Sequence, residues 1–185
     1  MNYTSSMRAI LQLDEGVYPL IHNAGKAVNY GMINILVFGL LHSISALHFS
    51  ETLLQTGEAG QAIPNALKLQ LMAVGVGVAF LMHASAALFL WVFSRGFGGR
   101  TAFLPVYLNL GLSLIALWPL APALAALQAG IRGGLLHGFI GLSALYALCV
   151  IFIGTKSASG LSTSRMSVAM MVTLVVVVSL MYLWT

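Results

Sequence analysis

Apolar residues in this sequence fall into five long runs separated by short polar stretches. The runs cover about residues 29–49, 67–93, 103–127, 135–154 and 166–183. A helix needs roughly 20 apolar residues to cross the hydrocarbon core of a membrane. The pattern therefore predicts an all-α, polytopic bundle of five transmembrane helices over residues 29–185. A four-span alternative fuses the third and fourth runs into a re-entrant hairpin, because only a tight turn separates them.

The segment before the first run, residues 1–28, has a weaker amphipathic pattern. Gly16 and Pro19 interrupt the helical spacing of its apolar side chains. We expect this segment to lie on the cytoplasmic membrane interface with its apolar side against the lipid. The alternative is an untethered tail. The apolar positions are Met7, Ile10, Leu11, Leu13, Val17 and Leu20.

The basic residues between the runs predict the orientation. Short cytoplasmic loops of membrane proteins carry an excess of Lys and Arg. Two basic residues, Lys68 and Arg132, fall on one predicted side of the membrane. The other six fall on the opposite side: Arg8, Lys26, Arg95, Arg100, Lys156 and Arg165. This asymmetry predicts a cytoplasmic N-terminus and an external C-terminus.

Composition agrees with a membrane protein. The 185 residues are 59% hydrophobic and 6% charged, whereas soluble domains carry about 25% charged residues. The net charge of +4 does not indicate nucleic-acid binding, because the basic residues are scattered singly. The single cysteine, Cys149, excludes an intrachain disulfide and a CxxC site.

The polar residues inside the apolar runs give little indication of catalysis or ion transport. No Asp, Glu, Lys or Arg lies well inside a predicted span, and such residues usually mark ion or proton pathways. The serines in the spans have no acid to orient a histidine, so we expect no intrinsic catalytic activity. Pro119 and Pro122 should bend or break the third span. A small-molecule permease would need a polar cavity there, with Asn34, Asn109, Ser113 and Tyr146 as its candidate lining.

Histidines offer one cofactor alternative. Two histidines from different helices can hold a b-type haem. At a rise of about 1.5 Å per residue, His42 in the first span and His137 in the fourth come to a similar depth. His83 is estimated to lie well below both, and His48 close to the outer surface. His42 and His137 are therefore the candidate haem ligands, against the alternative that each histidine forms a hydrogen bond between helices.

Small residues gather on several predicted spans. Gly75 and Gly77 lie in the second span, Gly111 in the third, and Gly138 and Gly141 in the fourth. Small residues let helix backbones approach closely, and such packing drives helix association in lipid. They predict a tightly packed bundle.

Two segments resemble a known family. At the loop between the second and third runs the sequence reads FSRGFGGRTAFLPVYLNLGLSLIALWPL, and at the end of the fourth run it reads YALCVIFIGTKSASGLSTSRMSVAMMVTL. Together they resemble the Yip/Yif family of five-span membrane proteins, which includes prokaryotic members. The resemblance covers the C-terminal half of the chain, and the first span matches in layout alone. The matching positions are Gly96, Gly98, Gly99, Phe103, Pro119, Gly154, Gly160, Leu161, Ser162 and Arg165.

The resemblance implies five spans with a cytoplasmic N-terminus. Eukaryotic members bind Rab-type GTPases through a long N-terminal region. In this sequence the corresponding segment, residues 1–28, is much shorter. The resemblance therefore implies a prokaryotic-type member in the inner (cytoplasmic) membrane. We expect a non-enzymatic scaffold or accessory subunit that packs against lipid and against other integral subunits or itself. The role of the external loop with Glu51 and Glu58 stays open.

Overall fold

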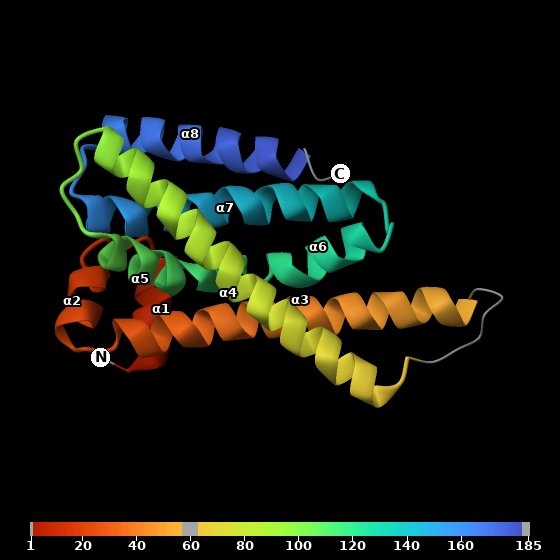
Figure 1. The fold of residues 1–185 in the computed structure, drawn as a ribbon. Coiled ribbons are helices and arrows are strands. Elements are labelled where there is room, and N and C mark those ends of the chain that lie inside the picture. Colours follow the sequence, from red (N-terminus) through yellow and green to blue (C-terminus); the bar gives the residue numbers. More distant parts are fainter. Residues whose placement is uncertain (1, 57–62, 183–185) are drawn as a thin grey trace.

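The computed structural model describes residues 2–56 and 63–182, and over these ranges the regular structure is helical. The chain folds back and forth into a bundle with the N-terminal helices at one end (Figure 1). Its elements are α1 (Tyr3–Leu11), α2 (Val17–Asn23), α3 (Ala27–Thr56), α4 (Asn65–Gly96), α5 (Phe103–Ser113), the 3₁₀ helix η1 (Leu114–Leu117), α6 (Leu120–Gln128), α7 (Gly134–Ser159) and α8 (Thr163–Tyr182).

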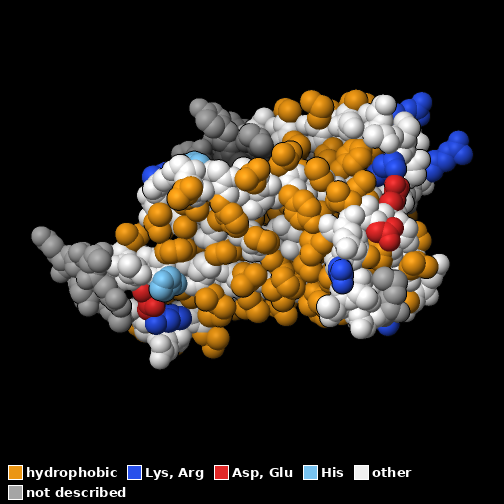
Figure 2. All heavy atoms as spheres, turned by 180° about the vertical axis from the view of Figure 1, so that it is seen from behind, with side chains coloured by type: hydrophobic (Ala, Val, Ile, Leu, Met, Phe, Trp, Pro, Cys, Tyr) orange, Lys and Arg blue, Asp and Glu red, His pale blue; other side chains and the backbone are white. Residues whose placement is uncertain are grey.

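Three of these helices, α3, α4 and α7, are each long and apolar enough to cross a membrane. A fourth candidate span needs α5 and η1 together with α6, and the two parts are bent by 71°. In α8 the apolar stretch Thr163–Val176 is shorter. The prediction of an all-α membrane bundle is confirmed, while the number five stays a prediction. Figure 2 shows a broad hydrophobic belt with Lys, Arg, Asp and Glu gathered at the two ends.

The third span breaks for the reason that the sequence predicts. A proline has no N–H to bond the carbonyl four residues earlier, and its ring crowds that carbonyl. The carbonyls of Ile115 and Trp118 precede Pro119 and Pro122 by four residues. Instead, each carbonyl accepts a hydrogen bond from the residue three positions later. The Ile115 carbonyl accepts from the Trp118 N–H at 3.2 Å, and the Trp118 carbonyl accepts from the Ala121 N–H at 3.3 Å. The tighter 3₁₀ geometry begins at Leu114, so the break starts nearer the middle of the span than the prolines alone indicate. We call α5, η1 and α6 the broken helix.

Glycines allow α4 to cross α3 diagonally at close range (Figure 1). A Cβ atom at Gly39 would lie 3.0 Å from the backbone of Val76, and one at Gly75 would lie 2.0 Å from Ser43 Oγ. Nearer the start of α3, Gly31 lies against Gly111 of the broken helix with almost no side chain between them. The predicted tight packing is therefore present at these contacts.

The N-terminal segment packs against the bundle, so it is not an untethered tail. The Asn2 side chain caps α1 by accepting a hydrogen bond from the Ser5 N–H at 2.8 Å. Met7, Ile10 and Val17 of the predicted apolar set are buried, together with two further residues, Tyr18 and Ile21. By contrast, Leu13 and Leu20 of that set are exposed. They lie in the turn between the two helices and on the outer side of α2, respectively.

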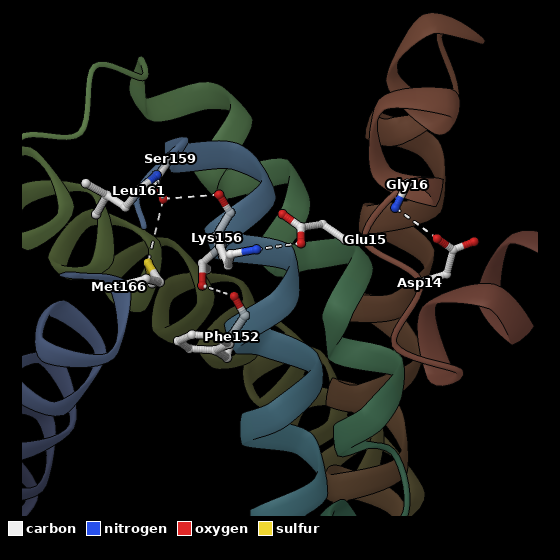
Figure 3. A network of polar contacts seen from close by, with 9 residues as sticks. Asp14, Glu15, Gly16, Phe152, Lys156, Ser159, Leu161 and Met166 are labelled. Atoms are coloured by element: carbon white, nitrogen blue, oxygen red, sulfur yellow. Dashed lines mark hydrogen bonds and ion pairs between the residues drawn. The ribbon is translucent and has the colours of Figure 1, made fainter. Parts of the chain in front are cut away.

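Two ion pairs mark the two ends of the bundle. Glu15, between α1 and α2, pairs with Lys156 near the end of α7 at 2.6 Å (Figure 3). The loops α4–α5 and α7–α8 lie at this same end (Figure 1), which gathers the six basic residues predicted to share one side. At the other end, Glu51 pairs with Lys68 at 2.5 Å. Glu58 lies outside the described residues.

Candidate functional site

A cavity of about 400 Å³ lies between α3, α4 and the broken helix. Most of its lining is aliphatic or aromatic, and Gly39 and Gly75 contribute no side chain to it. Among the described lining residues, three carry polar side chains: His42 of α3, His83 of α4 and Gln128 at the end of α6. None of these lining residues is charged. The cavity is thus an apolar chamber with a few polar points, as small-molecule sites usually are.

His83 is the most unusual side chain of the cavity. It is 4% exposed, and neither ring nitrogen has a hydrogen-bond partner among the described residues. The Tyr107 ring packs edge-on against the imidazole, with the two ring centroids 4.4 Å apart. The Tyr107 backbone does not reach hydrogen-bonding geometry with either ring nitrogen of His83. A Cβ at Gly111 would lie 3.5 Å from its Cε1. A buried polar group without a partner costs free energy, so it calls for an explanation.

His42 lies at nearly the same level as His83. Its Nε2 is 3.1 Å from Gln128 Oε1, which ties α3 to the end of the broken helix. At about 1.5 Å per residue, His42 lies about 22 Å from the start of α3, and His83 about 20 Å from the end of α4. The sequence placed His83 nearer the inner surface, because the predicted second span stopped three residues before Gly96, where α4 ends. The structure therefore brings together His42 and His83.

His137 lies elsewhere. It belongs to the first turn of α7, it is exposed, and its Nδ1 is 2.8 Å from the carbonyl oxygen of Gly133 in the same turn. It is not among the lining residues of the cavity. Haem ligation by His42 and His137 stays a prediction. The described residues include no group of three or more His, Cys, Asp or Glu side chains that could hold a metal ion.

The polar residues considered for a permease path form internal hydrogen bonds. Asn109 donates its amide to the Gly154 carbonyl at 2.9 Å, and its Oδ1 is 2.6 Å from His22 Nε2. Ser113 donates to the Asn109 carbonyl at 2.8 Å, and its Oγ is 2.9 Å from the Tyr18 hydroxyl. These bonds connect α2, the broken helix and α7, so they hold the N-terminal helices in place.

Asn34 holds α1 in place through similar hydrogen bonds. Its amide donates to the Leu112 carbonyl at 2.9 Å and to the Gly111 carbonyl at 3.3 Å, where the broken helix begins to tighten. Its Oδ1 accepts from the Tyr3 hydroxyl at 2.6 Å. Tyr146 donates to the carbonyl of Leu11. None of the four permease candidates lines the cavity that contains His83.

Burial raises the pKa of two phenols in the N-terminal helices. The pKa of Tyr18 rises to about 12, mainly because burial removes the phenol from water, although its hydrogen bond with Ser113 acts in the opposite direction. Burial also raises the pKa of Tyr3. Both side chains are therefore neutral hydrogen-bonding groups at physiological pH, which fits a structural role.

Sequence reasoning missed the cavity because its polar residues have no shared motif. Gln128 reads as a turn residue after the third run, and it meets His42 because the 71° bend redirects α6. One signal was present in the sequence. A histidine inside a span is a candidate functional residue by itself, because polar groups in a membrane are costly to bury.

In comparisons with known proteins, no family model, no curated protein and no solved structure matches this chain. The Yip/Yif resemblance therefore stays a prediction.

Proposed function

We propose that this protein is a non-enzymatic integral membrane protein that acts as a scaffold or accessory subunit of a larger membrane assembly. Its contact surface in this proposal is the outer half of α7, where Gly134, Gly138 and Gly141 share one side of the helix. We call these three residues the α7 glycine face.

The observation that supports the proposal is how the span glycines divide into two groups. Gly39, Gly75, Gly111 and Gly154 meet atoms of neighbouring helices, since a Cβ added at each would lie 2.0 to 3.3 Å from the nearest atom. At the α7 glycine face, and at the isolated Gly77 of α4, no described atom outside the helix's own local backbone lies within 4 Å of such a Cβ. The glycines of the first group are thus explained by packing within the chain, whereas the α7 glycine face is not.

The spacing of the α7 glycine face suits a helix partner. Gly134 and Gly138 form a G-x-x-x-G pair, and Gly141 follows one turn later on the same side. Without side chains, two backbones approach closely enough for extensive van der Waals contact, which drives helix association in lipid. The α7 window is also the least covered of the three long candidate spans, with 11% buried against 22% for each of the others.

The finer topology belongs to the same proposal. We infer five spans, with α8 as the fifth, a cytoplasmic N-terminus and a location in the inner membrane. The six basic residues at the end that carries α1 and α2 support this orientation. Membership of the Yip/Yif family is proposed on the matching glycines. Among them, Gly160 takes the left-handed conformation at the end of α7, with φ of 65°, and Gly154 leaves room for Tyr18 and Ser113.

Gentle extraction tests the proposal. The protein is purified in a mild detergent, and its mass is measured by native mass spectrometry with a Gly138→Leu variant beside it. We expect the unmodified protein to retain a second copy or another integral membrane protein, and Gly138→Leu to lose it. Gly77→Leu is the matched control, because Gly77 also lies in a span with no described atom within 4 Å of a Cβ there. A strictly monomeric protein that co-purifies with nothing would contradict the proposal.

A further inference from the structure

We propose that the cavity between α3, α4 and the broken helix binds a membrane-soluble small molecule that carries a carbonyl or hydroxyl group on an apolar body. His83 is the residue that hydrogen-bonds this oxygen. This ligand-binding proposal does not depend on the helix contact proposed for the α7 glycine face.

The shape of the cavity favours a ligand that arrives from the lipid. His83, Leu110 and Leu114 are buried and form the inner wall. Val78 and Met82 also line the cavity, yet they are 50% and 51% exposed. Both lie near the middle of α4, so the cavity opens on the side of the bundle between the two charged ends. A molecule dissolved in the membrane reaches such an opening without crossing water.

The chemistry of the walls defines the class of ligand. A neutral imidazole has one N–H donor and one nitrogen acceptor, and at His83 both lack partners among the described residues. Because no described lining residue is charged, phosphate and free divalent cations are poor candidates. A carbonyl accepts from the N–H, and a hydroxyl matches either nitrogen. The aliphatic remainder of the wall requires an apolar body.

A second polar group on the cavity wall narrows the class of ligand further. The His42–Gln128 pair lines the same cavity, and the Gln128 amide retains N–H donors beyond its contact with His42. Two separated donors around an apolar space suit a molecule with two oxygens. A quinone ring has this arrangement, and so does the ester region of an acylglycerol.

A purely structural role for His83 fits the contacts poorly. A histidine that stabilises helix packing in a membrane donates a hydrogen bond to a neighbouring helix. His83 makes ring contact with Tyr107, but no such bond forms among the described residues. Replacement by an apolar side chain of similar length removes an unpaired polar group, so His83→Leu should fold at least as stably as the original protein.

Ligand titration of the full chain in phosphatidylcholine nanodiscs tests the proposal. The probes are decylubiquinone and monoolein, and binding is followed by the ligand-dependent rise in melting temperature and by isothermal titration. We expect saturable binding of at least one probe. Saturation by decylubiquinone alone identifies a quinone as the source of the oxygen, and saturation by monoolein alone identifies a lipid ester. Either result supports the proposal.

Three variants show whether His83 is responsible. His83→Leu should weaken binding ten-fold or more, and His83→Gln, which keeps a donor, should weaken it less. His48→Leu is the control, because His48 is exposed near the end of α3 and does not line the cavity. If His83→Leu does not fold, His83→Gln decides by its affinity. The proposal is overturned if neither probe saturates, if the His83 variants bind as the original protein does, or if added haemin gives a His83-dependent Soret band in place of probe binding.

Discussion

The Tyr18 hydroxyl of α2 lies 2.9 Å from Oγ of Ser113, the last residue of α5 in the broken helix. Gly154 of α7 makes this contact possible, because a Cβ there would lie 2.5 Å from Ser113 Oγ and 2.9 Å from the Tyr18 hydroxyl. Three elements distant in the sequence thus meet at one buried point. The N-terminal helices are part of the folded bundle for this reason.

The buried phenol predicts a loss of stability at high pH. Burial raises the Tyr18 pKa to about 12, while an unfolded tyrosine ionises near pH 10. The stabilising contribution is therefore complete below pH 10 and is lost as the pH rises from 10 to 12. At about 1.4 kcal/mol per pKa unit, the shift of about two units corresponds to a total of about 3 kcal/mol. Tyr18→Phe should lack this loss, which thermal unfolding of both proteins at pH 8 and pH 11 measures. An equal alkaline loss in the two proteins would contradict the assignment.

Asn34 predicts a large structural effect. Asn34→Leu leaves the Tyr3 hydroxyl and two carbonyls of the broken helix without this partner. Since each buried group left unpaired costs roughly 1–3 kcal/mol, we expect a loss of about 3 kcal/mol in the free energy of unfolding. Asn29→Leu is the control on the exposed side of α3, where a change below about 0.5 kcal/mol is usual. Equal effects of the two substitutions, measured by denaturant titration in detergent, would show that the Asn34 bonds contribute little.

The crossing of α3 and α4 can be tested by a mutant cycle. Gly75→Ala places a Cβ 2.0 Å from Ser43 Oγ, and overpacking of this kind costs about 1–3 kcal/mol. Ser43→Ala removes the hydroxyl and leaves its own Cβ 3.2 Å away, so the double variant should recover part of the loss. Gly77→Ala, two residues along α4, should cost almost nothing. Melting temperatures check this, and additive losses in the double variant would mean that the two sites do not touch.

These residues also show how far the sequence predicts the structure. Run lengths and the two prolines predict the helices and the bend, because both depend on local chemistry. Gly39 and Gly75 read as small residues, yet their partners depend on how α3 and α4 cross, which no local pattern specifies. The burial of Tyr18 and Ile21 escaped prediction because these side chains pack against helices distant in the chain.

The candidate site was less accessible to sequence reasoning than the fold. Depth counting depends on where a helix ends, and an error of three residues displaces a side chain by about 4.5 Å along the axis. That was sufficient to separate His83 from His42 in the prediction. The contact of His42 with Gln128 depends on the angle of the bend, and a proline in the sequence predicts a break without its angle.

The proposed orientation predicts the side from which each loop is labelled. In a Cys149→Ser background, Arg132→Cys should react with a membrane-impermeant maleimide that is added to cells with a permeabilised outer envelope and an intact inner membrane. Thr101→Cys and Ser164→Cys should react after permeabilisation of the inner membrane. Thr101 in the α4–α5 loop and Ser164 in the first turn of α8 lie at the end with most of the basic residues. The reverse pattern of labelling would contradict the orientation.

Contact between the α7 glycine face and another helix in the membrane is central to the proposed function. A photo-crosslinking amino acid at Leu145, which is 62% exposed one turn beyond Gly141, reports on it directly. In intact membranes we expect a discrete cross-linked product at this position, and its loss when Gly138→Leu is added. The same group at Leu81 of α4, 67% exposed, should give no discrete product. No product at Leu145, or equal products at both positions, would contradict the claim.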